Sequence, residues 1–230
     1  MSVSIIIPAY NESESLPILI DEINENLNNK LEYEIIIVND CSIDLTENII
    51  KKCNFKNCIY IKNAKNIGQS FSIIEGIKKS NYNSIITIDA DLQNNPKDIL
   101  KLYNLYISND KLKLVGGIRN NRKDRIIKIL SSKIANTIRK IILNDNCSDT
   151  GCSLKVFDKK IFLTFPEFNG IHRFLPSLYK GYNFETTFIN VDHRPRIYGN
   201  SNYGILNRFF RGIRDIIKVK KIITKHKNNL

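Results

Sequence analysis

The sequence predicts an α/β protein in which one mainly parallel central sheet carries helices on both faces. Continuous apolar runs, typical of strands buried on both faces, end abruptly at polar residues. Each run is followed by apolar residues at helical spacing, and four such units fill the first half of the chain. No linker, repeat or low-complexity block interrupts the 230 residues, which favours a single domain.

The first half is predicted to alternate four strands with four helices. The strands are expected at residues 3–7, 34–38, 59–62 and 84–88. The helices are expected at residues 16–27, after a cap at Asp44 or Thr46, at residues 70–79, and from Pro96 onward. Ligands of such sheets bind at the carboxyl ends of the strands, so the polar residues that follow the four strands should meet at one edge.

The second half combines short strands with longer helices. Strands are expected at residues 115–118, within 148–157 and from 186, and helices at about 126–143 and 170–182. From residue 205 to about 225, apolar residues recur at helical spacing with Arg and Lys between them, which predicts a basic amphipathic helix. We therefore divide the chain into a domain at 1–204 and a C-terminal helix and tail at 205–230.

The charge balance is strongly basic, with 35 Lys+Arg against 23 Asp+Glu and a net charge of +12. This suits nucleic acid, a phosphorylated ligand or an anionic membrane surface, and charge alone does not choose among them. No segment reaches the ~20 apolar residues of a membrane span, and no signal peptide pattern is visible. The five cysteines lack metal-type spacing, which indicates free thiols in a reducing cytoplasm.

Two acids, Asp89 and Asp91, follow the fourth predicted strand. A pair of carboxylates without His or Cys selects a hard cation, Mg²⁺ or Mn²⁺, and such ions typically hold a substrate diphosphate. Gln93 can add a neutral oxygen or steer a sugar. The alternative is that Asp91 caps the helix near Pro96 while Asp89 is simply solvated.

Residues after the other strands extend this site. Tyr10 can stack on a nucleobase, Glu12 can bind ribose hydroxyls, and Asp40 can accept a hydrogen bond from a base ring N–H. The alternative for each is an ordinary turn residue or an acid that favours a helix N-terminus. The segment with Asn66 and Gly68 ends the third strand at the same predicted edge.

Two groups of arginines follow strands in the second half. Arg119 and Arg122 begin a cationic loop with Lys123 and Arg125, and Arg194 and Arg196 lie in a second segment, HRPR. A guanidinium can bind two phosphate oxygens at once, although a solvated loop explains any one of these residues equally well. Residues 199–204 (GNSNYG) are typical of a flexible lid. Neither GxGxxG after a strand nor a Walker motif is present, which excludes the dinucleotide-binding and P-loop interpretations.

Together the motifs resemble those of the family 2 glycosyltransferases, in the branch of the dolichyl- or polyprenyl-phosphate sugar transferases. The matching stretches, in order, are SIIIPAYNE (4–12), VNDCSIDLT (38–46), NIGQS (66–70), DADLQNNP (89–96), SDTGCSLKVF (148–157), HRFLP (172–176) and HRPRIYGNSNYG (193–204). The resemblance implies a GT-A fold, a nucleotide-diphospho-sugar donor with UDP or GDP, a divalent ion at Asp89 and Asp91, and inversion at the anomeric carbon.

The resemblance also implies roles for single residues. The catalytic set is Asp89, Asp91, Gln93, Arg119 and Arg196, and the metal ligands are Asp89, Asp91 and Gln93. Nucleotide-sugar contacts are expected from Pro8, Tyr10, Glu12, Asn39, Asp40, Asn66, Gly68 and Ala90. Acceptor-phosphate contacts are expected from Arg119, Arg122, Ser132, Arg194, Arg196 and Ser201.

Three departures from the family pattern matter. Asn39 stands where many members have Asp, and Asn202 stands where the GxSKYG pattern has Lys. The membrane helices of some relatives are missing. Delivery of a lipid would then depend on the basic C-terminal helix or on another protein.

Residues 149–152 (DTGC) differ from the ED and QxxRW signatures of processive polysaccharide synthases, and together with the surplus of arginines this favours a polyprenyl phosphate acceptor. A phosphate is already anionic and needs no general base. The alternative is a hydroxyl of a cell-surface glycan, with Asp149 as the base. A third interpretation, from another class, is a nucleic-acid-binding module, which the lack of aromatics beside the basic runs disfavours. The protein is expected at the cytoplasmic face of a membrane, where the helix at 205–225 either lies in the interface or packs on the domain. The sugar, the base and the oligomeric state stay open.

Overall fold

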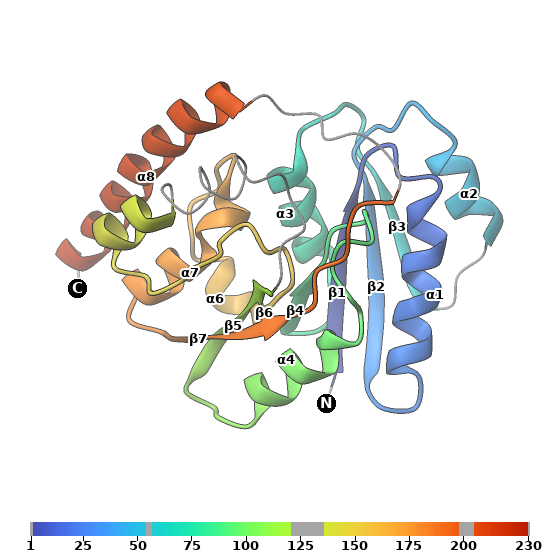
Figure 1. Ribbon diagram of the computed structural model, residues 1–230, viewed down its shortest axis with the longest axis horizontal. Helices are drawn as coiled ribbons and strands as arrows, with labels where there is room; N and C mark the ends of the chain where they lie inside the picture. The colour runs from blue at the N-terminus through green and yellow to red at the C-terminus, as the bar shows by residue number, and fades with distance from the viewer. Residues whose placement is uncertain (1, 54–56, 121–135, 198–204, 230) are drawn as a thin grey trace.

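A computed structural model describes residues 2–53, 57–120, 136–197 and 205–229 (Figure 1). Among these residues the strands form one seven-stranded sheet in the order β3-β2-β1-β4-β6-β5-β7. The strands are β1 Ser2–Ala9, β2 Glu32–Asn39, β3 Cys58–Lys62, β4 Ser84–Thr87, β5 Leu112–Arg119, β6 Lys155–Asp158 and β7 Glu185–Val191. The α/β prediction is confirmed.

The sheet is mainly parallel, as predicted, with one strand reversed. β1 pairs in parallel with β2 and β4, β2 with β3, and β5 with β7. β6 runs antiparallel to both of its neighbours, β4 and β5. The start of β6 therefore lies beside the end of β4, where Thr87 faces Lys155, and the segment before β6 reaches the edge at which β1, β2 and β4 end.

Helices cover both faces of the sheet. They are α1 Ser15–Leu27, α2 Thr46–Cys53, α3 Gln69–Lys79, α4 Asp98–Ile107, α6 Lys159–Phe162, α7 Ile171–Gly181 and α8 Ile205–Asn228, together with the helical residues 136–143. The four helices that were predicted in the first half correspond to α1 to α4. Of the helix predicted at 126–143, residues 136–143 are helical and 126–135 lie outside the described residues.

The strand period of two divides the core into two layers. Ile5 and Ile7 of β1 pack with α1 and α4 on one face, whereas Ile6 packs with α3 and α7 on the other. α1 and α8 accordingly lie on opposite sides of the sheet in Figure 1. Gly76 lets α3 approach the sheet closely, since a Cβ at that position would lie 2.7 Å from Cγ2 of Ile6.

α8 packs on α7 through one of its faces. Ile216 and Val219 are buried in the α3–α7 layer, and His226 stacks on Tyr182 with 3.6 Å between the ring centroids. This is the packing alternative of the sequence analysis, realised for that face of the helix. No helix in the described part of the chain combines the length and apolar character needed to cross a membrane.

Candidate active site

The polar residues after β1, β2 and β4 do meet at one edge of the sheet. Loops that follow β1 and β2 are joined by hydrogen bonds from the backbone N–H of Glu12 to Oγ1 of Thr46 (2.9 Å) and from that of Asn11 to Oγ of Ser42 (3.0 Å). The first residue of α3 reaches the loop after β4, where Nε2 of Gln69 donates to Oδ1 of Asp89 at 2.7 Å. This convergence follows from the parallel order of the strands.

Asp40 is engaged within the chain. Its buried carboxylate accepts hydrogen bonds from Nδ2 of Asn63 at 2.8 Å and from the backbone N–H groups of Ile67 and Gly68 at 2.9 and 2.8 Å. These bonds hold the loop that leads into α3. A carboxylate has about four acceptor positions, so one position at Oδ2 is left for the expected base contact.

Asn39 is fully buried and serves the turn after β2. Its Oδ1 accepts from the backbone N–H of Ser42 at 2.9 Å, and its Nδ2 donates to the hydroxyl of Tyr60 at 3.0 Å. This amide therefore has a structural role in the turn, and its expected nucleotide contact stays a prediction. Pro8 and Tyr10 are partly exposed at the end of β1, and Asn66 is exposed, so these side chains are open to a ligand.

The loop after β4 is held from below by the segment before β6. The backbone N–H of Asp89 donates to Oγ of Ser153 (3.1 Å), and that hydroxyl donates to Oδ1 of Asn94 (2.8 Å). Leu92 is buried and has a φ of 62°, which is uncommon for a residue other than glycine. The loop is thus fixed in a strained shape that presents both acids at one place, and strain of this kind clusters at functional sites.

The electrostatics of the two acids fit a divalent cation. Burial, followed by the nearby charge of Asp91, raises the pKa of Asp89 to about 6. Burial also raises the pKa of Glu12. Carboxylates that are held close together and lose solvation in this way gain from a shared hard cation, and their oxygen donors are those that Mg²⁺ and Mn²⁺ prefer. Ala90 between them is buried, and Gln93 contacts Asp91 through its backbone N–H at 3.1 Å.

Arg196 contacts the second acid directly. One of its terminal nitrogens, Nη2, donates to Oδ2 of Asp91 at 2.5 Å, and 30% of the arginine side chain is exposed. The negative charges of Asp91, Glu12 and Asp89 raise the pKa of Arg196 against the opposing effect of burial, which is the largest single influence. Arg196 therefore lies beside the acids, and its expected contact with a phosphate stays a prediction.

Arg194 holds the loop after β4 in place. It forms a two-point ion pair with Glu22 of α1, at 2.8 and 2.7 Å, and also donates to the backbone carbonyls of Leu92 and Asn94. These contacts brace the strained loop, and the expected contact of Arg194 with an acceptor phosphate stays a prediction.

Arg119 is paired with the acid that the hydroxyl-acceptor alternative needs as a base. Its Nε and Nη2 donate to the two oxygens of Asp149 at 2.7 and 2.8 Å, and its backbone N–H donates to Oδ2 at 3.2 Å. Asp149 is buried. Because both carboxylate oxygens receive charged hydrogen bonds, Asp149 is badly suited to take a proton from a hydroxyl.

Several expected site residues lie outside the described residues. These are Arg122, Ser132 and Ser201, and also Asn202 and the proposed lid at 199–204. Their predicted roles stay predictions.

The sequence analysis missed three residues that complete the site. Gln69 contacts Asp89, Ser153 supports the same residue, and Lys155 is buried with its ammonium on the carbonyl of Cys152. The charge of Lys155 lowers the pKa of Asp89 in opposition to burial. All three lie inside quoted motifs, NIGQS and SDTGCSLKVF, so the motifs carried the signal although only other positions in them were interpreted.

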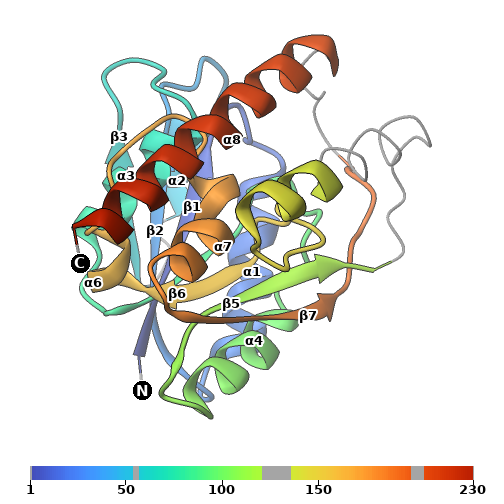
Figure 2. The same cartoon turned by 90° about the vertical axis from the view of Figure 1, so that its left-hand side faces the viewer.

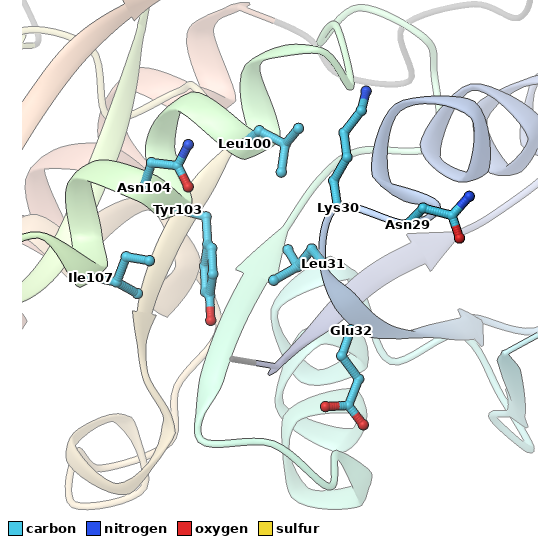
Figure 3. A pocket seen from close by; sticks show the side chains of 8 residues that line it. All are labelled: Asn29, Lys30, Leu31, Glu32, Leu100, Tyr103, Asn104 and Ile107. Atoms are coloured by element: carbon cyan, nitrogen blue, oxygen red, sulfur yellow. The ribbon is translucent and has the colours of Figure 1, made fainter.

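A cavity of about 440 Å³ lies at the opposite edge of the sheet. It is lined by the residues between α1 and β2 and by α4, among them Lys30, Leu31 and Tyr103 (Figure 3). Lys30 and Leu31 precede β2, whereas the two acids follow the ends of the strands. This cavity is therefore separate from the site described here.

An α/β sheet with two acids after its fourth strand, and arginines facing them, is the arrangement of a glycosyltransferase of the GT-A fold. The model of the family described as "Glycosyl transferase family 2" matches residues 4–164. The chain belongs to this family. Because the chain belongs to a family of glycosyltransferases, we do not retain the interpretation as a nucleic-acid-binding module.

Relatives with a known role place the chain near one branch of the family. It is 34% identical over 208 residues to undecaprenyl-phosphate 4-deoxy-4-formamido-L-arabinose transferases of Yersinia pestis (strain Pestoides F) and Yersinia pseudotuberculosis (serotype O:3, strain YPIII). The aligned region covers 89% of this chain and 63% of theirs. The chain therefore corresponds to somewhat less than two thirds of the length of these relatives.

Solved structures show the same fold. Glucosyl-3-phosphoglycerate synthase from Mycobacterium tuberculosis, in complex with Mn²⁺, UDP and glucosyl-3-phosphoglycerate, superposes with a TM-score of 0.72 at 13% identity, over 95% of this chain and 78% of that one. Mannosyl-3-phosphoglycerate synthase from Rubrobacter xylanophilus gives 0.71 at 14% identity, over 100% of this chain and 76% of that one. At these identities the likeness shows the fold alone.

Proposed function

We propose that the protein transfers a sugar from a nucleotide-diphospho-sugar to a polyprenyl phosphate, with inversion at the anomeric carbon. The similarity to undecaprenyl-phosphate sugar transferases supports the class of acceptor. The observation that carries the proposal is the two-point pairing of Asp149 with Arg119. A hydroxyl acceptor requires a base, whereas an acceptor phosphate attacks without one.

The proposed reaction uses a Mg²⁺ or Mn²⁺ ion held by Asp89 and Asp91, with Gln93 as a further ligand. Such an ion stabilises the negative charge that grows on the departing nucleoside diphosphate. Around it, Gln69 fixes the orientation of Asp89 by its 2.7 Å hydrogen bond. Tyr10 and Glu12 are assigned to the nucleoside, together with the remaining acceptor position of Asp40.

Arg196 is assigned to a phosphate group. It is the guanidinium that contacts Asp91 and is partly exposed, so it can exchange that contact for a phosphate oxygen once the acid binds the cation. Arg119 keeps its two-point ion pair with Asp149, whose charges offset each other, so Arg196 is the arginine that we assign to the acceptor phosphate. A phosphate held by Arg196 would attack the face of the sugar opposite to the leaving group.

A pair of matched acceptors tests the proposal. Purified full chain is incubated with Mn²⁺ and a panel of UDP-, GDP- and dTDP-sugars, and with either undecaprenyl phosphate or undecaprenol, which differ only in phosphate against hydroxyl. We expect transfer to undecaprenyl phosphate alone, loss of transfer in EDTA, and an inverted anomeric configuration by NMR. Transfer to undecaprenol or to glycans, with none to the phosphate, would overturn the proposal.

A further inference from the structure

The helical residues 136–143 and α8 share a groove on the side of the molecule that faces away from α1. The groove has a volume of about 730 Å³. Ile142 lines it from the first helix, and Ile217, Lys220, Lys221 and Lys225 line it from α8. We call this surface the basic groove. It is formed by two segments that are far apart in the sequence and lie side by side.

The face of α8 that lines the basic groove is fixed by the packing of its other face. A Cβ at Gly181 of α7 would lie 2.6 Å from the side chain of Ile223, so the two helices are in close contact. Asp215 pairs with Arg173 of α7 at 3.0 Å, and Nζ of Lys218 lies 4.9 Å from the ring centroid of Phe168. α8 therefore cannot turn its lysines inward without losing these contacts.

The basic groove exposes apolar side chains from both helices. Ile217 of α8 is 52% exposed, and Ile142 of the facing helix is 39% exposed. Ile213 and Ile141 do not line the groove, but they are also exposed on the same two helices, at 38% and 77%. Single exposed isoleucines need no explanation, but exposed isoleucines that face each other across a groove on two neighbouring helices are typical of an interaction surface.

The charge around these isoleucines has one sign. The part of α8 whose side chains are described, from residue 212 onward, contains six Lys or Arg residues and a single acid, Asp215. That acid is buried and paired with Arg173. The exposed surface of this part of α8 is therefore cationic with apolar side chains among the charges.

We propose that the basic groove docks on an anionic phospholipid bilayer. Isoleucines enter the boundary between headgroups and acyl chains, and the lysines beside them meet the phosphates of the lipids. A second copy of the chain would bring lysines against lysines. A nucleic acid would satisfy the lysines but would leave the isoleucines in water. The inference rests on the proposed function, because a polyprenyl phosphate acceptor is itself embedded in a bilayer.

The residues of α8 that line the basic groove belong to its later turns, from Ile217 onward. In Figures 1 and 2 the first turns of α8 lie toward the upper edge of the molecule, where β1 and β2 end, and the helix runs down from there to the C-terminus. The basic groove is therefore a separate surface from the edge that carries Asp89 and Asp91, and docking there would attach the chain to the bilayer that holds the acceptor.

Sedimentation with vesicles tests the docking surface. The full chain is mixed with vesicles of phosphatidylcholine alone or with vesicles that also contain about 30% phosphatidylglycerol. The fraction of the protein that sediments with the vesicles is measured. We expect binding only to the anionic vesicles. Two double variants should weaken it by about tenfold or more: Lys221→Glu with Lys225→Glu, and Ile142→Ser with Ile217→Ser. Matched controls on other surfaces, Lys111→Glu and Ile18→Ser, should leave it unchanged.

A second measurement separates this inference from the proposed function. Thermal shift with Mn²⁺ and nucleotide-sugars should be the same for the groove variants and the unmodified chain, which also shows that the variants fold. The docking surface would be overturned if the groove variants bound anionic vesicles as well as the unmodified chain does. It would also be overturned if these variants lost dimer formation or duplex DNA binding and kept their vesicle binding. If vesicles bind as expected and undecaprenyl phosphate is not glycosylated, the proposed function fails and the surface stands.

Discussion

Two regions of the site each pair an arginine with an aspartate, and the two pairs differ in how tightly they are held. In the region around β5, Arg119 grips both oxygens of Asp149, and the two side chains are 13% and 7% exposed. In the region after β4, Arg196 touches Asp91 through one nitrogen, with 30% of the arginine exposed. The two aspartates are equally shielded, at 7% exposed, so the pairs differ in the number of hydrogen bonds between the side chains and in how far the arginine is exposed.

The difference follows from where each arginine lies in the fold. Arg119 ends β5, which is hydrogen-bonded on both sides, so its backbone and side chain are directed at Asp149 together. Arg196 lies beyond the end of β7, an edge strand, and is anchored two residues earlier by the contacts of Arg194 with Glu22. Within the HRPR segment, Arg194 holds the backbone through Glu22 and the loop after β4, and Arg196 contacts Asp91.

The largest effects are expected from removing each aspartate charge. Asp149→Asn should lower the free energy of unfolding by about 3 kcal/mol, because Arg119 is left buried without its partner. Asp91→Asn should change it by less than about 1 kcal/mol, since Arg196 can reach solvent, yet it should reduce kcat by about 100-fold or more. Urea unfolding and steady-state kinetics of both variants check this. Equal losses of stability would remove the distinction between the pairs.

A smaller effect is expected on the binding of metal without nucleotide. Arg196→Gln should tighten Mn²⁺ binding by about three- to fivefold, because the guanidinium no longer competes for Asp91 and a partly exposed pair is worth about 1 kcal/mol. Arg194→Gln is the matched control: it should lower the melting temperature without tightening Mn²⁺ binding. Free Mn²⁺ is measured by electron paramagnetic resonance. Unchanged or weaker Mn²⁺ binding by Arg196→Gln would show that Arg196 does not share the metal site.

The smallest effect concerns pH. Nδ1 of His172 lies 2.8 Å from Oγ of Ser70 at the start of α3, and burial lowers the pKa of His172 to about 3. In the unfolded chain this histidine binds a proton near pH 6.5, whereas in the folded chain it does so only near pH 3. The free energy of unfolding therefore decreases progressively as the pH falls from 6.5 toward 3. We expect a loss of about 0.8 kcal/mol at pH 6. His172→Gln should flatten the dependence of urea midpoint on pH, and an unchanged slope would contradict this origin.

The acids of the site were predictable from the sequence because their signal is local. Asp89 and Asp91 directly follow an apolar strand, and the order of parallel strands implies that they lie near Glu12 and Asp40. The two arginines of HRPR look equivalent in the sequence. What separates them is Glu22, a residue 172 positions before Arg194, and a contact of that range leaves no local pattern.

The reversed strand explains the other omissions. Because β6 runs against β4, the residues before it come up beneath the loop after β4, and this places Ser153 under Asp89. An apolar run in the sequence predicts a strand but not its direction in the sheet. The internal hydrogen bonds of Asp40 and Asn39 could not be predicted either. A polar residue after a strand gives the same sequence pattern whether it binds a ligand or closes a turn.

Gly76 influences the site indirectly, through the position of α3. A side chain at this position requires either α3 or the side chain of Ile6 to shift, because Cγ2 of Ile6 is only 2.7 Å from where a Cβ would be. Gln69 opens the same helix, seven residues or about 10 Å along its axis from Gly76. If a methyl group at position 76 displaced α3, it would also move the side-chain amide of Gln69 that orients Asp89. The orientation of Asp89 can thus be changed by a substitution at a residue that does not itself touch a ligand.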